Sequence, residues 1–197
     1  TRVQAVYVHI SKAMDEKNGG KTSESTFSKE FAPSTKHSVR ILSTSNCIDG
    51  IASGATAEGI ISAHVLTHAD LIPGKVYHNV PVLAQLNGGA MLVDFGLGVR
   101  GLIPPLQLFD QAADSDYRTK MSKVKYAVGA KVDVRVLSVD VESKRCVVTA
   151  KKTLIKADDV ISSYDHIKLG DKGTGFISKV DDRGLSVTLF GGVYGRV

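Results

Sequence analysis

Several residue types and patterns that define other protein classes are scarce in this sequence. It has no tryptophan, only 6% of its residues are aromatic, and no apolar run reaches the roughly 18 residues of a membrane-spanning helix. Its two cysteines, Cys47 and Cys146, lie about one hundred positions apart. We therefore expect no transmembrane helix and no disulfide framework, with both cysteines as buried thiols in a reducing compartment. The chain begins at Thr1 without a basic and then apolar leader, so we expect a soluble piece of a longer protein.

A complete catalytic or metal-binding motif is also missing. Gly20-Lys21-Thr22 matches the end of a phosphate-binding loop, but Asp15 stands where that loop requires its first glycine. Asp94-Phe95-Gly96 copies a kinase triplet without the other kinase motifs. His64 and His68 are four residues apart, with no further ligand at a suitable spacing. We therefore predict that the chain is not an enzyme and has no catalytic residues, no metal and no cofactor.

Positive charge is concentrated in one stretch of the chain. The formal net charge is +5, and 43% hydrophobic with 23% charged residues fits globular domains. From Arg118 to Lys156 there are eleven lysines and arginines against three acids, Asp133, Asp140 and Glu142. A polyanion such as RNA suits this surface, because each phosphate contact releases counterions. A solvated surface that only keeps the domain soluble accounts for the charge equally well.

The sequence repeats itself with a period of about 95 residues. Phe31–Ser43 aligns with Tyr126–Ser138 at an offset of 95, and Gly98–Ile103 aligns with Gly192–Val197 at an offset of 94. The period divides the chain into three parts. These are the C-terminal part of a first repeat (1–68, with a mobile loop near 17–28), a complete repeat (69–157) and the N-terminal part of a third repeat (158–197).

The complete repeat has the periodicity of β-strands. Val132, Val134 and Val136 alternate with charged residues, which predicts a strand with one buried face. Turn residues separate five such segments, and the polar stretch between the third and fourth has room for a short helix. The expected strands cover 76–86, 90–95, 101–103, 131–139 and 146–150, and the expected helical insert lies within 106–126. We predict an all-β fold of tandem five-stranded Greek-key barrels of the oligonucleotide-binding (OB) class.

The order of short motifs in this repeat resembles the ribosomal-protein-S1 repeat. Their spacing over about 80 residues is more specific than any one of them, and Val8-His9-Ile10-Ser11 is similar to the end of the third strand in such repeats. The motifs are Pro73-Gly74-x-Val76, Asn87-Gly88, Gly98-x-x-Gly101-Leu102-Ile103-Pro104, Val128-Gly129-x-x-Val132-x-Val134-x-Val136, and Asp140 with Arg145-x-Val147-Val148-Thr149-x-Lys151.

Two further strings are similar to a many-repeat eukaryotic ribosomal RNA biogenesis factor, the programmed cell death protein 11 family. They are GLIPPLQLFD at Gly101–Asp110 and VTAKKTLI at Val148–Ile155. This resemblance implies a nucleolar scaffold that acts in pre-rRNA processing within early pre-ribosomal particles such as the small subunit processome. The implied partners are precursor ribosomal RNA and other ribosome assembly factors in a large particle, with no membrane and no small-molecule substrate.

The sequence departs from this family at the residues that stack on bases. RNA-binding S1 repeats carry aromatic residues on strands two and three and a histidine at the end of strand three, because base stacking tolerates any sequence. Asn87 and Ala90 occupy the aromatic positions of the complete repeat, and Pro104 occupies the histidine position. Only His9 in the first repeat fits the pattern, while Arg183 takes the first aromatic position of the third. We therefore expect contact with the RNA backbone through basic residues.

The candidate RNA-binding residues follow from this expectation. Arg100 flanks the third strand, Arg135 is expected to project from the charged face of the fourth, and Lys144 and Arg145 lie in the following loop. Arg40 and Arg135 occupy equivalent repeat positions, so they share either an RNA contact or a structural role. The complete set is Arg100, Arg135, Lys144, Arg145, Lys120, Lys123, Lys125, His9, Arg40 and Arg183.

Three functions remain open. The repeats bind precursor rRNA mainly through charge, or they are degenerate OB barrels that serve as protein-docking spacers in the same particle. In the third alternative they form the accessory S1 domain of a ribonuclease, which tandem repeats make less favourable. The basic stretch favours the first function, and the missing aromatic residues favour the second.

Overall fold

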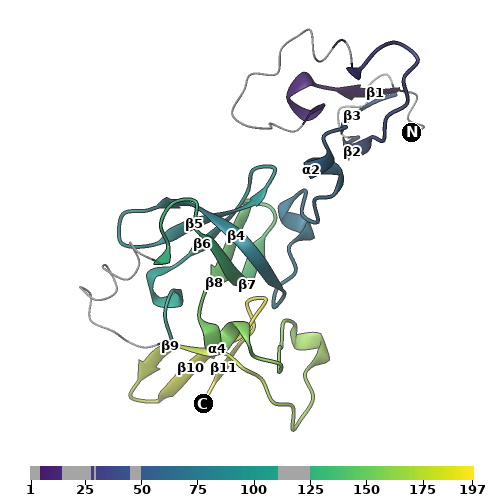
Figure 1. Ribbon diagram of the computed structural model, residues 1–197. Helices are drawn as coiled ribbons and strands as arrows, with labels where there is room; N and C mark the ends of the chain where they lie inside the picture. The colour runs from purple at the N-terminus through teal and green to yellow at the C-terminus, as the bar shows by residue number, and fades with distance from the viewer. Residues whose placement is uncertain (1–4, 15–27, 29, 45–49, 111–124) are drawn as a thin grey trace. The chain divides into compact units, whose positions relative to one another are not determined.

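A computed structural model describes residues 5–14, 28, 30–44, 50–110 and 125–197 of the chain. They form two compact units, Thr1–Leu66 and Thr67–Val197 (Figure 1). Cys47 lies outside the described residues, and so does the expected loop near 17–28 except for its last residue. Of the expected helical insert within 106–126, only the beginning and the end are described.

The second unit contains a closed five-stranded β-barrel with strand order β4-β5-β6-β8-β7. Its strands pair antiparallel except for β6 and β8, which are parallel. The all-β barrel predicted from the sequence is confirmed, and each strand lies within about two residues of its expected bounds. The strands are β4 (Val76–Gln85), β5 (Met91–Gly96), β6 (Val99–Ile103), β7 (Lys131–Asp140) and β8 (Arg145–Thr149). A 3-10 helix, η3 (Pro105–Gln107), follows β6.

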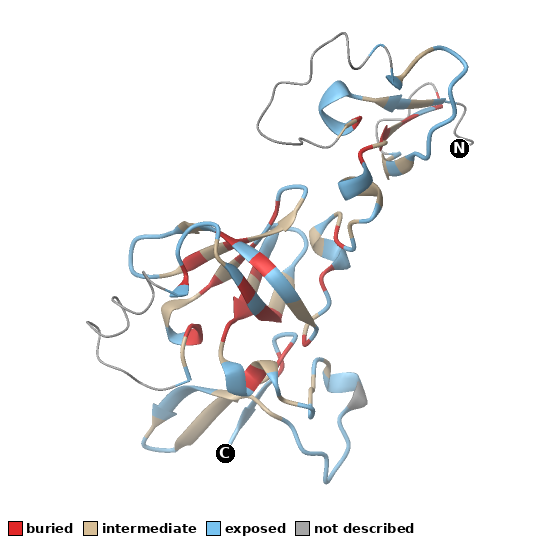
Figure 2. Ribbon diagram, viewed as in Figure 1, coloured by how far each residue is buried: buried red, intermediate tan, exposed pale blue. Residues whose placement is uncertain are grey.

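The barrel interior is filled by the apolar positions of the alternating strands (Figure 2). Val134, Val136 and Val148 are completely buried. Gly101 is needed on β6 because a Cβ atom there would lie 2.8 Å from the Phe95 ring. Such close packing is what makes a small barrel interior sensitive to added atoms.

The first unit reproduces the second half of this barrel. Its sheet has the order β1-β3-β2, with β1 parallel and β2 antiparallel to β3, as β6, β8 and β7 are paired in the barrel. A short helix follows the last strand in both. The elements are β1 (Ala5–Val8), η1 (Ile10–Lys12), β2 (Arg40–Ser43), β3 (Ile51–Ala55) and α2 (Glu58–Ile61).

The C-terminal part reproduces the first half of the barrel. Strands β9 (Phe176–Asp181), β10 (Gly184–Thr188) and β11 (Tyr194–Arg196) form an antiparallel meander, as β4, β5 and β6 do. The connecting elements are η2 (His68–Asp70) before the barrel, and α4 (Lys152–Ile155) and η4 (Tyr164–His166) after it. The tandem arrangement is thus visible as one complete barrel and two half-barrel sheets. The division at 1–68, 69–157 and 158–197 stays a prediction.

The C-terminal sheet belongs to the same compact unit as the barrel because a loop from it packs on β7. Phe190 is completely buried, and the Gly191 amide donates a hydrogen bond of 2.7 Å to the Leu137 carbonyl of β7. This packing covers an outward face of the barrel that the sequence pattern marks as polar.

Candidate nucleic-acid interface

The family's base-stacking positions lie in the turn before β5, directly before β5 and directly after β6, and these positions with β5 and β6 are called here the β5–β6 face. Asn87 is exposed in the tight turn between β4 and β5, and Ala90 is partly exposed just before β5. Pro104 follows β6 and caps η3. None of these three side chains has a ring that stacks like an aromatic one, so bases have no platform at these positions.

Arg100, Lys144 and Arg145 are exposed, and the parallel register of Leu102 with Val147 places Arg100 of β6 near the start of β8. Arg100 lies on β6 opposite Asp94 of β5. Lys144 ends the turn between β7 and β8 with a positive φ of 52°. Asp140 holds this turn, because its carboxylate accepts hydrogen bonds of 3.1 Å from the amides of Glu142 and Ser143.

The hydrogen bonds from Ser143 are the largest influence on Asp140 and lower the pKa of its carboxyl group. The carboxylate therefore stays ionised while it holds the turn. Lys144 and Arg145 are presented to solvent by a defined turn, as a phosphate contact requires.

Lys125 lies at the other end of the barrel, before β7. Its ammonium group is 5.1 Å from the centre of the Tyr126 ring and 5.9 Å from that of Phe109, within cation–π range. The buried Tyr126 hydroxyl donates a hydrogen bond of 2.8 Å to the Leu108 carbonyl, which fixes this platform. Two other candidates, Lys120 and Lys123, lie outside the described residues.

The expectation that Arg135 projects from an exposed, charged face is wrong. Its side chain is only 8% exposed, and its guanidinium donates hydrogen bonds of 2.6 Å to the Leu154 carbonyl and 2.7 Å to the Ala157 carbonyl. Burial lowers its pKa, although Asp158 acts in the opposite sense. The outward face of β7 is covered at this point, and the guanidinium is engaged with backbone carbonyls.

Arg40 makes the equivalent contacts in the first unit. Its guanidinium donates hydrogen bonds to the carbonyls of Ile60 (3.1 Å), Ile61 (2.8 Å) and Ala63 at the end of α2. The role shared by Arg40 and Arg135 is therefore to bind the carbonyl end of the helix that follows the last strand. Of the two alternatives that the repeat left open, the structure shows the structural one.

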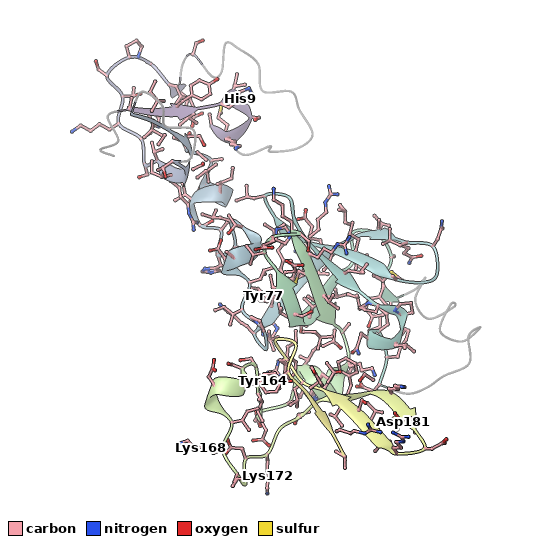
Figure 3. All side chains as sticks on the ribbon, turned by 180° about the vertical axis from the view of Figure 1, so that it is seen from behind. His9, Tyr77, Tyr164, Lys168, Lys172 and Asp181 are labelled. Carbon is pink, nitrogen blue, oxygen red and sulfur yellow. The ribbon has the colours of Figure 1, made fainter. Side chains whose placement is uncertain are left out.

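His9 and Arg183 are exposed, each in one of the flanking sheets. The His9 ring (Figure 3) lies 2.8 Å from the Ser11 hydroxyl and caps η1 by accepting a hydrogen bond from the Ser11 amide. Arg183 lies in the turn between β9 and β10, where its amide bonds the Asp181 carboxylate at 3.0 Å. Asp181 is itself paired with Arg196 at 2.8 Å. Both candidates remain accessible for RNA contact.

A second basic surface is formed by residues that lie far apart in the sequence. It is a cleft of about 440 Å³ between the start of β7 and α4, called here the β7–α4 cleft. Only Lys125 of its four lysines was a candidate, although the concentration of charge between Arg118 and Lys156 indicated the region. The lining residues are Asn79, Lys125, Tyr126, Lys131, Val132, Asp133, Ala150, Lys152, Ile155 and Lys156.

The described residues contain no group of three or more His, Cys, Asp or Glu side chains placed to hold a metal ion. Among them, no helix is both long enough and apolar enough to cross a membrane. Cys146 is a buried free thiol in the barrel, and burial raises its pKa to about 12. It is therefore protonated at neutral pH and does not act as a nucleophile.

Comparison with known proteins agrees with this geometry. Residues 82–151 match the family described as S1 RNA binding domain. The chain is 35% identical to the Protein RRP5 homolog of Homo sapiens over 193 residues, which is 97% of this chain and 10% of that protein. The Mus musculus homolog is 32% identical over 177 residues, 89% of this chain and 9% of that protein.

The rRNA biogenesis protein RRP5 of Arabidopsis thaliana is 32% identical over 170 residues, 86% of this chain and 8% of that protein. This chain thus spans about a tenth of the length of these relatives. The resemblance expected from the sequence is confirmed: the chain carries an S1 domain and is similar to a segment of the RRP5 proteins along most of its length.

Proposed function

We propose that this chain is a non-catalytic RNA-binding segment of a ribosome biogenesis factor. The S1 match and the names of the relatives, which include rRNA biogenesis proteins, support an RNA ligand from the ribosomal precursor. The proposed setting is the nucleolus, in an early pre-ribosomal particle with other assembly factors. The chain then serves pre-rRNA processing by holding RNA, and the chemistry belongs to other proteins.

One observation carries the proposed mode of binding. The β5–β6 face has no aromatic ring at Asn87, Ala90 or Pro104, yet β6 and the start of β8 carry exposed cations. Arg100, Lys144 and Arg145 form no ion pair within 4.0 Å with a carboxylate of the described residues. Contact through phosphates needs such unpaired cations and does not need rings. The proposed contact is therefore ionic and largely independent of base sequence.

The test is the salt dependence of RNA affinity, measured with the 197-residue chain and a single-stranded RNA oligonucleotide. For single-stranded RNA, the slope of log affinity against log salt becomes more negative by about 0.7 for each phosphate contact. Lys144→Glu with Arg145→Glu should weaken binding and flatten the slope. Lys168→Glu with Lys172→Glu is the matched control, because both lysines are exposed and lie in the 158–197 segment (Figure 3).

The missing stacking platform also supports a second function, in which the barrel is a protein-docking spacer. In that case RNA affinity is absent at low salt, or the slope does not change in the Lys144→Glu, Arg145→Glu variant. Cleavage of the RNA by this chain alone would contradict both functions.

A further inference from the structure

The β7–α4 cleft is built from other strands than the β5–β6 face. In the closed order β4-β5-β6-β8-β7, strand β7 is bonded to β4 and β8 and to neither β5 nor β6. The cleft is built on the first residues of β7 and on α4, with Asn79 of β4 at its edge. Asn87, Ala90 and Pro104 are not among the residues that line it.

Four lysines line this cleft: Lys125, Lys131, Lys152 and Lys156. None of their ammonium groups lies within 4.0 Å of a carboxylate among the residues that the structure describes. Burial, followed by repulsion from Lys152, lowers the pKa of Lys125, with Asp110 acting in the opposite sense. The folded chain therefore gathers positive charges that repel one another, and a bound polyanion relieves this repulsion.

The carboxylate that lines the cleft, Asp133, and the one that acts on Lys125, Asp110, are engaged elsewhere. Asp133, which lines the cleft, accepts a hydrogen bond of 3.0 Å from the Asn79 amide and lies 3.3 Å from the His78 ring. Asp110 accepts hydrogen bonds of 3.1 Å from the amides of Lys152 and Thr153 at the start of α4. Both carboxylates accept hydrogen bonds from backbone amides that shape the cleft, and the lysine ammonium groups remain available to bind an anion.

The positions of the lysines are fixed by buried contacts. Lys152 and Lys156 are four residues apart, and the Lys156 amide donates a hydrogen bond of 3.0 Å to the Lys152 carbonyl, so both project from one helical turn. The guanidinium of Arg135 bonds the carbonyls of Leu154 and Ala157 at the end of the same turn. Arg135 is thus a positioning residue that holds two lysines against the start of β7.

The chemistry of the cleft selects phosphates rather than bases. Tyr126 is buried, its hydroxyl is bonded to Leu108, and Lys125 covers its ring, so this ring offers no free face for stacking. The remaining floor is aliphatic, from Val132, Ala150 and Ile155. A volume of about 440 Å³ lies within the range of small-ligand sites, about 300–1,000 Å³, and admits a nucleotide-sized unit.

We propose that the β7–α4 cleft is a phosphate-binding site for the RNA backbone, separate from the β5–β6 face. This inference rests on the proposed function and adds the place where the charge-driven contact is made. RNA held there is bound by Lys131, Lys152 and Lys156 at the rim and by Lys125 on its aromatic platform.

The experiment compares three variants of the 197-residue chain. Lys131→Gln, Lys152→Gln and Lys156→Gln are combined, since glutamine removes each charge while keeping much of the side-chain stem. A control with the same loss of charge combines Lys36→Gln, Lys168→Gln and Lys172→Gln, all exposed positions outside the cleft. The third variant is Lys144→Glu with Arg145→Glu. Far-ultraviolet circular dichroism and thermal unfolding establish that each variant is folded.

We expect the cleft variant to bind single-stranded RNA about tenfold more weakly or worse, with its salt slope reduced by about 2 for three lost contacts. The control triple variant should change affinity by less than about threefold. Amine acetylation with mass spectrometry gives a direct readout without substitution. RNA should protect the cleft lysines and leave Lys168 and Lys172 reactive.

The outcomes separate this inference from the proposed function. If RNA binds the original chain but the cleft variant matches the control and no cleft lysine is protected, the inference is overturned and the proposed function stands. If RNA does not bind the original chain at low salt, both are overturned. Polyglutamate serves as a second polyanion: protection by polyglutamate and not by RNA assigns the cleft to an acidic protein and overturns the inference.

Discussion

The guanidinium of Arg135 lies over the ring of Phe190, with 5.4 Å between its central carbon and the ring centre. Arg135 belongs to the barrel strand β7, and Phe190 belongs to the segment that follows the barrel by about 40 residues. The same guanidinium bonds the end of α4 between them. One side chain thus ties the barrel, the connecting helix and the next sheet together, and its equivalent in the first unit, Arg40, bonds α2 in the same way.

Replacing Arg135 with alanine should destabilise the second unit by about 2–4 kcal/mol, because a buried and a partly buried carbonyl lose their donor and a cavity opens beside Phe190. Urea unfolding measures this change. Arg135→Lys should be intermediate, since an ammonium group does not match the geometry of the guanidinium. Arg100→Ala at an exposed position is the control and should stay within about 0.5 kcal/mol. Equal midpoints for Arg135→Ala and Arg100→Ala would contradict the structural role.

Asp110 should make the stability of α4 depend on pH in the acid range. Desolvation raises its pKa, but hydrogen bonds from Thr153 and Lys152 outweigh this effect and the pKa is lowered. A carboxyl group with a lowered folded pKa stabilises the fold above its unfolded pKa of about 3.9, and this contribution disappears as pH falls through the folded pKa.

Comparing the original chain with Asp110→Asn separates the contribution of Asp110 to the pH dependence of stability from those of Asp133 and Asp140, whose pKa values are also lowered. We expect the variant to be less stable than the original chain at pH 7, because an amide side chain has one acceptor oxygen where the two carboxylate oxygens accept separately from Lys152 and Thr153. The difference should shrink below pH 4. A difference that stays constant from pH 7 to pH 2.5 would show that Asp110 does not act through its charge.

Cys146 should be unreactive in the folded chain. Burial raises its pKa to about 12, so roughly one thiol in ten thousand is ionised at pH 8, and the barrel wall excludes reagents. Iodoacetamide labelling followed by mass spectrometry should modify Cys146 only after urea is added. Rapid labelling without denaturant would place this thiol outside the packed barrel.

Aromatic residues installed on the β5–β6 face should restore base stacking. Asn87→Phe with Ala90→Phe should tighten single-stranded RNA binding by about 1–3 kcal/mol for each base stacked, because the rings return to the family's positions. The salt slope should not change, since no phosphate contact is added. Asn87→Leu with Ala90→Leu controls for added apolar surface. Equal affinity of the two variants would show that this face does not contact bases.

The strands could be predicted from the sequence because their signal is local. Alternation at Val132, Val134 and Val136 placed β7, and paired glycines at Gly88 and Gly89 placed the turn between β4 and β5, as their positive φ angles show. The equivalence of Arg40 and Arg135 was also visible in the repeat, together with the idea of a shared role. No local pattern in the sequence predicts which carbonyl groups these guanidinium groups bind.

The all-β barrel, the order of its strands along the chain, the concentration of positive charge and the absence of stacking residues could all be predicted from the sequence. Which outward-facing residues stay exposed depends on tertiary packing. Strand periodicity separates two faces of a strand, but α4 and Phe190 cover the outer face of β7 through contacts 19 to 55 residues away. The same long-range packing brings Lys131 beside Lys152 and Lys156, because closing the barrel places the start of β7 next to the helix that follows β8.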